Sequence, residues 1–420
     1  MAEKFDKSKL YRHSYLVGGA VRDILLGHEA KDKDYVIFGL SEDQVMSTGI
    51  FDKAGNHFPI FINREDGCEY ALARTERKTG EGYNGFDTYT SKDVTIHDDL
   101  YRRDLTINAI AKERTAENYY DPYNGFQDIE DKVFRHVSDS FWEDPVRVLR
   151  VARFRARFGP EWTVAQETKD LMRMMGKKGV LNELTAERVW KELSRALMEN
   201  YPRLFFDTLL ETDTLKVLFP EVYYLKAALE SYKWHPEGDA YEHSMLVLMQ
   251  SAYHDMDLTS RLSCLVHDFG KGITPKEEMP NHFKHDVKGV KVVDDFCHRL
   301  TVPAKMREHA KKATRYHMTC HRLNESNPKT IVKMFDAMKV LNDPESVDVL
   351  YNVGICDERG RLGSEQNDYN HVMMLKKMFY AYKSVKFNDV VGDVNASVDK
   401  IKQKLYNART KAVKKVMSEA

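Results

Sequence analysis

The chain has 420 residues, of which 42% are hydrophobic and 31% are charged, and its formal net charge is −1. This composition is typical of a soluble globular protein and excludes a disordered or membrane-spanning chain, and the length favours roughly two to four domains. No apolar run approaches the length of a bilayer span, and the start MAEKFDKSKL is too polar for a secretory signal. We therefore expect a cytoplasmic protein.

Cysteine and charge patterns narrow the class further. Five cysteines occur without paired spacing, which favours reduced, mostly buried thiols over a zinc ribbon or a disulfide framework. Because the net charge is close to zero, any nucleic-acid contact must come from local segregation of charge. Arginines gather between residues 147 and 157, and lysines between residues 400 and 415. For the C-terminal run, a solvated helix face and a contact with RNA remain equally open.

The apolar pattern changes once along the chain. Up to about residue 140, short apolar runs such as YLVGGAV, DYVIFG, HFPIFI and CEYALA predict a sheet with a few helices. From residue 141 onward, apolar residues recur every three or four positions, which predicts helices. We expect the α+β class, with a mixed sheet followed by all-helical parts. The predicted domains are a head (1–140), a helical neck and body (141–225), a histidine-rich domain (226–365) and a basic helical tail (366–420).

Two short motifs near the N-terminus suggest phosphate and metal chemistry. YLVGGAVRD runs a strand into Gly18 and Gly19 and then into a helix with Arg22. Backbone N–H groups at such a turn can approach a phosphate, although two glycines are more often a tight turn only. Asp32 and Asp34 begin the next strand, where residues i and i+2 share a face. Paired carboxylates need a cation such as Mg²⁺; the alternative is a charged, frayed edge strand.

The segment DDLYRRDLTINAIA carries polar groups suited to a nucleotide. It places Arg102, Arg103, Asp104 and Asn108 at the entrance of a predicted helix. Guanidinium groups bind phosphates, and carboxylate and amide groups can select ribose hydroxyls.

WEDPVRVLRVARF offers a way to read a base edge. Asp144 and Arg147, three residues apart on one predicted helix face, supply an acceptor for an exocyclic amino group and donors for ring acceptors, with Arg150 one turn further. Cytosine and adenine could both satisfy this pair. The structural alternative is that Asp144 caps the helix, Pro145 is its first residue and Arg147 pairs one turn on.

Histidines cluster in the third predicted domain: ten of the sixteen lie between His235 and His321. RLSCLVHDFGKG ends an apolar helix with His267 and Asp268. Neighbouring helix positions diverge by about 100°, so these two can share an ion only if other helices complete the site. His243 upstream and Asp357 downstream could do so.

The ordered series GGAVRD, KDKD, EYALARTERKTGEGYNGF, RRDLTINA, EDPVRVLR and LTAERVWKEL, between residues 14 and 200, resembles the motifs of class II tRNA nucleotidyltransferases, the CCA-adding enzymes. The resemblance implies a polymerase-β-like head in which Asp32 and Asp34 bind catalytic Mg²⁺ ions. It implies that Asp144 and Arg147 read CTP or ATP, supported by Arg150. It also implies nucleotide contacts for a larger set: Gly18, Gly19, Arg22, Arg102, Arg103, Asp104 and Asn108.

Further expectations follow from the same resemblance. Glu69 matches an acidic position of the family, and the segment from Arg74 through Gly85 is similar to the mobile segment associated with the switch from C to A addition. The implied partners are tRNA, CTP and ATP, with no membrane. Either a monomer or a homodimer is compatible with the sequence.

The order H…HD…D formed by His243, His267, Asp268 and Asp357 resembles the HD phosphohydrolase superfamily. An attached HD domain is typical of the bacterial multifunctional CCA-adding type, which implies hydrolysis of 2′,3′-cyclic phosphates, 2′-nucleotides and related phosphates with a divalent transition metal such as Ni²⁺. In the family pattern two further histidines, matched here by His285 and His317, are candidate ligands of a second ion. The family carries Asp after the second of these histidines, whereas this chain has Met318.

Two other functions stay open at this point. Bacterial poly(A) polymerase shares the nucleotidyltransferase motifs and adds A only. An HD phosphohydrolase could also carry a non-catalytic nucleotidyltransferase-like domain that serves as an RNA-binding module. Nucleotide choice separates the first from CCA addition, and the intact acidic pair Asp32 and Asp34 argues against the second.

Overall fold

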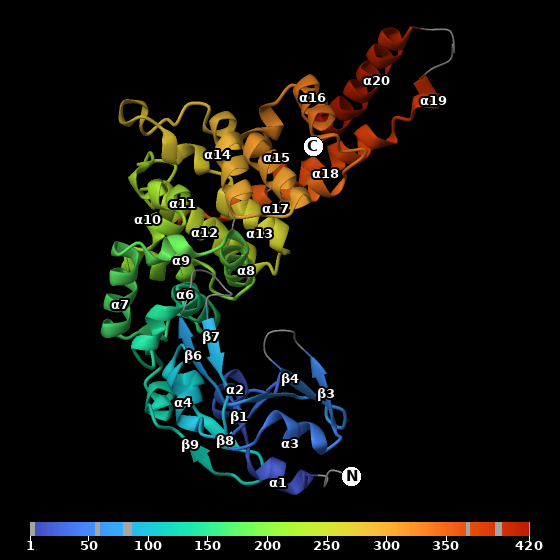
Figure 1. The fold of residues 1–420 in the computed structure, drawn as a ribbon. Coiled ribbons are helices and arrows are strands. Elements are labelled where there is room, and N and C mark those ends of the chain that lie inside the picture. The colour runs from blue at the N-terminus through green and yellow to red at the C-terminus, as the bar shows by residue number, and fades with distance from the viewer. Residues whose placement is uncertain (1–4, 55–58, 79–85, 367–369, 391–396, 420) are drawn as a thin grey trace. The chain divides into compact units, whose positions relative to one another are not determined.

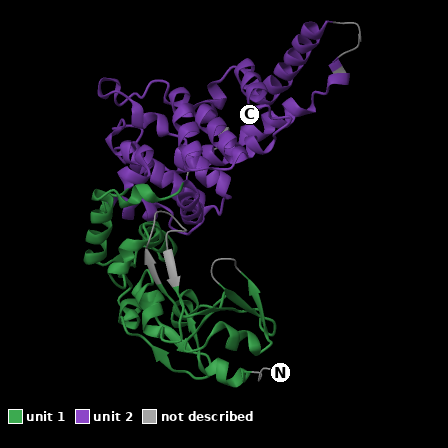
Figure 2. Cartoon of the chain, viewed as in Figure 1, with its two compact units in different colours: residues 1–185, 211–214 green, residues 186–210, 215–420 purple. Residues whose placement is uncertain are grey.

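The computed structural model describes residues 5–54, 59–78, 86–366, 370–390 and 397–419. The chain forms two compact units (Figures 1 and 2). Unit 1 comprises residues 1–185 and 211–214, and unit 2 comprises residues 186–210 and 215–420. The expected α+β class is confirmed, since a mixed sheet in unit 1 is followed by a helical unit 2. The finer division into four domains stays a prediction.

Unit 1 is built around a seven-stranded sheet with the order β3-β4-β5-β2-β1-β8-β9. Neighbouring strands are antiparallel except β2 and β5, which are parallel. Tyr35 of β2 stacks on Tyr70 of β5 with ring centroids 4.7 Å apart, which adds to the apolar packing of this centre. The strands are β1 (Ser14–Val17), β2 (Asp34–Ile37), β3 (Phe51–Ala54), β4 (Ile60–Asn63), β5 (Glu69–Leu72), β8 (Ala111–Glu113) and β9 (Tyr119–Tyr120).

Helices and two small sheets complete unit 1. Strands β6 (Thr75–Lys78) and β7 (Phe86–Tyr89) form one antiparallel pair, and β10 (Val133–Phe134) and β11 (Thr163–Val164) form a parallel pair. Helix α6 lies between β10 and β11 in the chain and buries most of its apolar residues. The helices are α1 (Lys7–Arg12), α2 (Gly19–Leu25), α3 (Glu42–Ser47), α4 (Ile96–Tyr101), α5 (Gly125–Glu130), α6 (Val146–Phe158) and α7 (Gln166–Lys177).

Unit 2 consists of helices, as the three- and four-residue apolar spacing predicts. It begins with α8 (Ala186–Leu197) and α9 (Arg203–Glu211), the last residue of which belongs to unit 1, followed by α10 (Leu215–Leu218) and α11 (Pro220–Tyr224). The histidine-rich part contains α12 (Ala240–Tyr253), α13 (Leu258–Val266), α14 (His285–Arg299), α15 (Ala304–His321), α16 (Pro328–Met338) and α17 (Glu345–Arg359).

The basic C-terminal segment forms α18 (Asn370–Ser384), α19 (Phe387–Val390) and α20 (Val398–Ser418). Its apolar residues join a core with α15, α16 and α17, in which Val413 of α20 is fully buried. Four of the five cysteines are buried and all five are free thiols, as expected. Within the residues that the structure describes, no helix is both long and apolar enough to cross a membrane.

Candidate active sites

The turn between β1 and α2 brings two guanidinium groups to the backbone. Gly18 has φ +71° and precedes α2, a conformation that L side chains rarely adopt. A Cβ atom at Gly18 would lie 2.9 Å from Nη1 of Arg103, and one at Gly19 would lie 3.3 Å from Nη2 of Arg22. Both glycines therefore leave room for cationic groups beside the first N–H groups of a helix. This arrangement suits a phosphate.

The acidic pair lies next to this turn. Asp34 is the first residue of β2 and pairs with Val17, the last residue of β1, whereas Asp32 lies in a bend before the strand. The prediction that both stand on a strand is therefore wrong for Asp32, because β1 ends at Val17 and Gly18 turns the chain away. Both side chains reach solvent. In the parallel pair of β2 and β5, Glu69 stands in register with Asp34.

The charges around Asp34 fit a divalent cation. Partial desolvation raises the pKa of the Asp34 carboxyl, the Arg103 guanidinium opposes this rise, and the Asp32 carboxylate adds to it. The two carboxylates thus repel each other in the absence of a counter-ion. Solvent-facing carboxylate oxygens are the ligands that Mg²⁺ prefers.

A hydrogen-bonded chain connects three elements behind this turn. Arg22 Nη1 on α2 donates to Asn108 Oδ1 at 2.8 Å, Asn108 Nδ2 donates to Asp104 Oδ1 at 2.9 Å, and Arg150 Nε on α6 donates to Asp104 Oδ2 at 2.8 Å. Burial opposes ionisation of Asp104, yet the Arg150 charge and these bonds hold its pKa well below the usual range. The helix expected after Asp104 is a single 3₁₀ turn (Thr106–Asn108).

Asp104 should therefore stabilise unit 1 in a pH-dependent way. Since its folded pKa is lowered, the stabilisation is present above the unfolded pKa of about 4 and is lost as the pH falls below it. We expect Asp104→Asn to cost about 2 kcal/mol at pH 6, and the difference from the parent to shrink by about 1 kcal/mol at pH 3. Urea unfolding followed by tryptophan fluorescence measures both values. The exposed Asp131→Asn is the control, and an equal cost at both pH values would contradict the argument.

Asp99 on α4 holds both arginines of the RRD motif and was not among the predicted site residues. Its side chain is fully buried; Oδ1 accepts from Arg102 Nε at 3.2 Å and Oδ2 from Arg103 Nη2 at 3.0 Å. Burial opposes ionisation of Asp99, but the two guanidinium charges lower its pKa. The spacings of three and four residues in DDLYRR were the sequence signal for this pairing.

Asp144 and Arg147 frame the start of α6. Asp144 Oδ1 accepts the Val146 N–H at 3.2 Å and its carbonyl accepts the Arg147 N–H at 3.1 Å, so Asp144, directly before the N-cap residue Pro145, satisfies two N–H groups of the first turn. Arg147 is 8% exposed; its Nη1 donates to Ser140 O at 2.7 Å and its Nη2 to Arg102 O at 2.6 Å. These bonds fix the guanidinium close to the RRD motif. Base reading by the pair stays a prediction.

The segment implied to switch nucleotides is described in part. The carbonyl of Arg74 accepts from Arg102 Nε at 3.2 Å, which ties the beginning of this segment to the RRD motif. Residues 79–85, and with them Gly85, lie outside the described residues.

In unit 2 the structure brings the four predicted HD residues together. His243 lies on α12, His267 directly follows α13, Asp268 comes next, and Asp357 lies on α17. His243 Nε2 lies 2.9 Å from Asp357 Oδ1, and His267 Nε2 lies 3.2 Å from Asp268 Oδ2 and 3.8 Å from Asp357 Oδ2. All four side chains are buried.

His285 and His317 form a second group around the same aspartate. His285 Nε2 and His317 Nε2 lie 3.3 Å and 3.4 Å from Asp268 Oδ1, and 3.1 Å from each other. The donor atoms of these three residues lie within 4.8 Å of one another. Gly270 allows this approach, because a Cβ there would overlap the backbone oxygen of His285.

The donor set fits a metal ion. His267 Nε2 and Asp268 Oδ1 are buried and form no hydrogen bond within the described residues. Unsatisfied buried polar atoms cost about 1–3 kcal/mol each, which coordination to a cation would remove. Imidazole nitrogens with carboxylate oxygens suit divalent transition metals. The residues could therefore hold one such ion at His243, His267, Asp268 and Asp357, and another at Asp268, His285 and His317.

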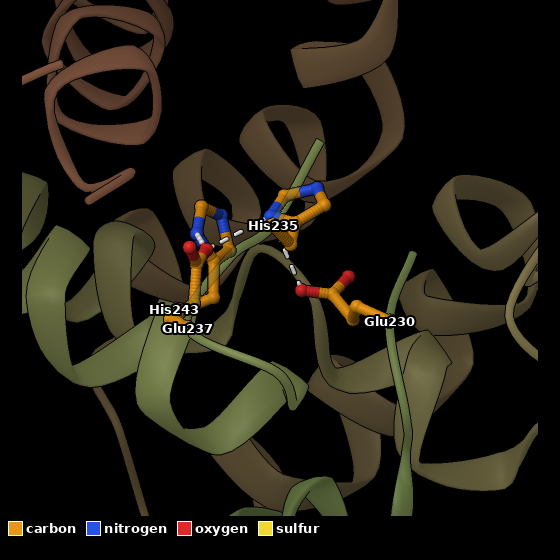
Figure 3. Close-up of side chains that lie close together, drawn as sticks. All are labelled: Glu230, His235, Glu237 and His243. Atoms are coloured by element: carbon orange, nitrogen blue, oxygen red, sulfur yellow. Dashed lines mark hydrogen bonds and ion pairs between the residues drawn. The ribbon is translucent and has the colours of Figure 1, made fainter. Parts of the chain in front are cut away.

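Sequence reasoning missed the residues that hold these ligands. Glu237 Oε1 lies 2.9 Å from His243 Nδ1 (Figure 3), so the histidine donates there and leaves Nε2 for the site. Lys271 Nζ lies 2.6 Å from Asp268 Oδ2 and also pairs with Glu230. His321 pairs with Asp357. Lys271 stands in the motif HDFGKG, but its partner Glu230 is 41 residues away in the sequence. Glu237 lies only six residues before its partner His243, in a loop whose fold no motif reveals.

Comparisons with known proteins agree with this division. Residues 14–135 match the poly A polymerase head domain, residues 162–225 match the family described as a probable RNA and SrmB-binding site of polymerase A, and residues 240–341 match the HD domain. The fold and the two sites thus define a nucleotidyltransferase head joined to an HD domain.

Relatives identify the family. The chain is 44% identical over 384 residues to the multifunctional CCA protein of Acinetobacter baumannii strain AYE, covering 91% of this chain and 93% of the relative. It is 44% identical over 400 residues to that of Acinetobacter baylyi, covering 95% and 96%. The chain belongs to the family of multifunctional CCA proteins, and the resemblance found in its motifs is confirmed.

Solved structures show the same fold. A CCA-adding enzyme with CTP matches with a TM-score of 0.63 at 19% identity, covering 99% of this chain and 95% of that one. The Thermotoga maritima CCA-adding enzyme complexed with tRNA matches with a TM-score of 0.61 at 19% identity, covering 99% and 97%.

Proposed function

We propose that this chain adds CCA to the 3′ end of tRNA from CTP and ATP without a nucleic-acid template. The observation that carries the proposal is the convergence of Asp32 and Asp34 with Arg103 and the Gly18 turn, in a chain of the multifunctional CCA family. We place this activity in the cytoplasm. It would serve both maturation and repair of tRNA.

The head would act chiefly by positioning and charge. The tRNA 3′-hydroxyl attacks the α-phosphate of the nucleotide, and pyrophosphate leaves. Mg²⁺ held by Asp32 and Asp34 would neutralise charge on the phosphates. Arg22 and Arg103 face the Gly18 turn, where they can bind the triphosphate oxygens together with the N–H groups of α2.

Selection of the nucleotide would fall to the residues around the RRD motif. Asp104 and Asn108 would select the ribose, with Asp104 held by Arg150. Asp144 and Arg147 would read the base edge, and the bonds from Arg147 to backbone carbonyls would fix its orientation.

The HD domain would supply a second phosphate chemistry. We propose hydrolysis of 2′,3′-cyclic phosphates, 2′-nucleotides and related phosphate monoesters at the site of His243, His267, Asp268 and Asp357. A divalent transition metal, with Ni²⁺ as our candidate, would act there as a Lewis acid on the phosphate. Removal of a terminal cyclic phosphate restores the free 3′-hydroxyl that CCA addition needs, so the two activities would act on the same damaged end.

Incorporation on a tRNA that lacks its 3′ CCA tests the main proposal. With Mg²⁺, CTP and ATP we expect two C additions, one A addition and a stop, resolved at single-nucleotide resolution. Open-ended addition of A would establish poly(A) polymerase activity instead. No extension combined with hydrolysis of cyclic phosphates would favour an HD phosphohydrolase with a non-catalytic head.

Two substitutions at Asp144 separate base reading from helix capping. Asp144→Ala removes both the cap and the carboxylate, whereas Asp144→Ser retains a capping oxygen but no carboxylate. If the carboxylate reads the base, both variants lose about 1–3 kcal/mol of discrimination between CTP and UTP, measured as the ratio of kcat/KM values. Normal discrimination in Asp144→Ser would leave Asp144 only the capping role.

A further inference from the structure

A second set of buried acidic groups lies beside His243, in the loop that leads into α12 (Figure 3). His235 Nδ1 lies 2.9 Å from Glu237 Oε1 and 3.2 Å from Glu230 Oε2. The side chains of Glu230 and Glu237 are 2% and 1% exposed, and that of His235 is 15% exposed. Donor atoms of these three residues and of His243 lie within 4.8 Å of one another.

Among the residues that the structure describes, each of the two carboxylates has one oxygen without a hydrogen bond. Glu230 pairs with Lys271 through Oε1, and Glu237 bonds His235 and His243 through Oε1. The remaining oxygens, Glu230 Oε2 and Glu237 Oε2, are buried and form no hydrogen bond among the described residues. Since carboxylate oxygens only accept, a cation or a donor must satisfy them.

The local charge also favours a cation. Four carboxylates have side chains at most 4% exposed; the Lys271 ammonium pairs with two of them, Glu230 and Asp268, and the Arg361 guanidinium is 26% exposed. Buried charges are stable only when paired or bound to metal. Ions bound at the HD site would neutralise part of this excess, but they would lie on the Nε2 side of His243, whereas Glu237 lies on its Nδ1 side. The four carboxylates are Glu230, Glu237, Asp268 and Asp357.

The loop is closed at its base before any ion binds. Leu229 and Asp239 form an antiparallel bridge, and the Glu230 N–H donates to Gly238 O at 3.0 Å. Asp239 also caps α12 by accepting the Glu242 N–H at 2.9 Å. Glu230 and Glu237 are thereby held face to face, with His235 between them, which is a preorganised arrangement for a ligand.

We propose that Glu230, His235 and Glu237 bind a further divalent transition-metal ion, separate from the ions of the HD site. One imidazole nitrogen and carboxylate oxygens are donors that Mn²⁺, Co²⁺, Ni²⁺ and Zn²⁺ accept, with water completing the coordination. The ion fixes Glu237, and Glu237 in turn orients His243 through its Nδ1–H. The further ion therefore has a positioning role for the HD site.

Counting bound Mn²⁺ tests the proposal directly. The metal-free full chain, His235→Ala and the control His298→Ala are titrated with Mn²⁺ alone, and the bound ion is quantified by electron paramagnetic resonance. His298 is an exposed histidine of α14, with 59% of its side chain accessible. We expect the parent and His298→Ala to bind one ion more than His235→Ala, and equal stoichiometry in all three chains would overturn the proposal.

Anomalous diffraction from Mn²⁺-soaked crystals of the parent gives a test that needs no variant. We expect a peak about 2.2 Å from His235 Nδ1, between Glu230 and Glu237. The same peak should persist in His267→Ala, which removes a ligand of the HD site. Peaks confined to the HD residues, or loss of the His235 peak in His267→Ala, would show that no separate site exists.

Discussion

Asp34→Asn is expected to lower CCA addition by more than about a hundredfold and to leave hydrolysis of 2′,3′-cyclic phosphates at the parent rate. Replacement of outer-shell partners of a metal costs about 10–100-fold, so loss of a carboxylate that holds the ion directly should cost more. Asp34 begins β2 beside the Gly18 turn, in unit 1, whereas the HD residues lie in unit 2. Single-nucleotide extension and opening of a 2′,3′-cyclic nucleotide to the nucleoside monophosphate measure the two activities on one preparation.

Asp43→Asn provides the matched control for this experiment. Asp43 is an exposed aspartate of α3 in the same unit, so the substitution makes the same chemical change away from the acidic pair. Undiminished incorporation by Asp34→Asn would exclude Asp34 as a metal-binding residue. Loss of both activities would indicate general misfolding.

His267→Ala should produce the opposite pattern, with hydrolysis reduced by more than about a hundredfold and CCA addition unchanged. Within the described parts of the chain, the buried His267 Nε2 forms no hydrogen bond, and it faces Asp268 and Asp357, so its removal takes away a nitrogen donor that lies beside both carboxylates. The measurement compares hydrolysis of 2′,3′-cyclic and 2′-nucleotides across a series of added divalent metals.

The exposed His298→Ala controls for loss of a histidine from unit 2. A His267→Ala variant that hydrolyses cyclic nucleotides at the parent rate would place the hydrolytic metal elsewhere. Restored activity at high metal concentration would instead show that His267 contributes affinity, as expected of one ligand among several.

Much of the head could be predicted because its chemistry is local in the chain. Gly18 and Asp34 each stand within short motifs whose spacing relates directly to a turn or a strand start. The prediction for Asp32 is wrong because the length of β2 depends on the strand with which it pairs. That strand, β1, ends at Val17, and the motif KDKD gives no sign of this end. Asp99 was missed although its spacing to the arginines was visible, since nothing in the sequence shows that its side chain is fully buried.

The HD site illustrates what spacing alone leaves out. The ligand order H…HD…D could be recognised, and the structure brings those residues together from helices α12 and α17 and the turn after α13. Lys271 could not be assigned because its partner Glu230 is 41 residues away in the sequence, and Glu237 because its contact with His243 depends on the loop that the Leu229–Asp239 bridge closes. Polar groups that support ligands depend on tertiary structure, whereas the ligands themselves follow the order of the motif.

The close approach of His285 and His317 to Asp268 depends on the absence of a side chain at Gly270. Because any Cβ there would overlap the backbone oxygen of His285, a larger residue must push the first turn of α14 outward. His285 lies on that turn, with its Nε2 3.3 Å from Asp268 Oδ1. The displacement would therefore separate these two side chains although neither residue is substituted. In a saturation library selected for hydrolysis, position 270 should therefore tolerate glycine alone, as strictly as the ligand positions tolerate their own residues.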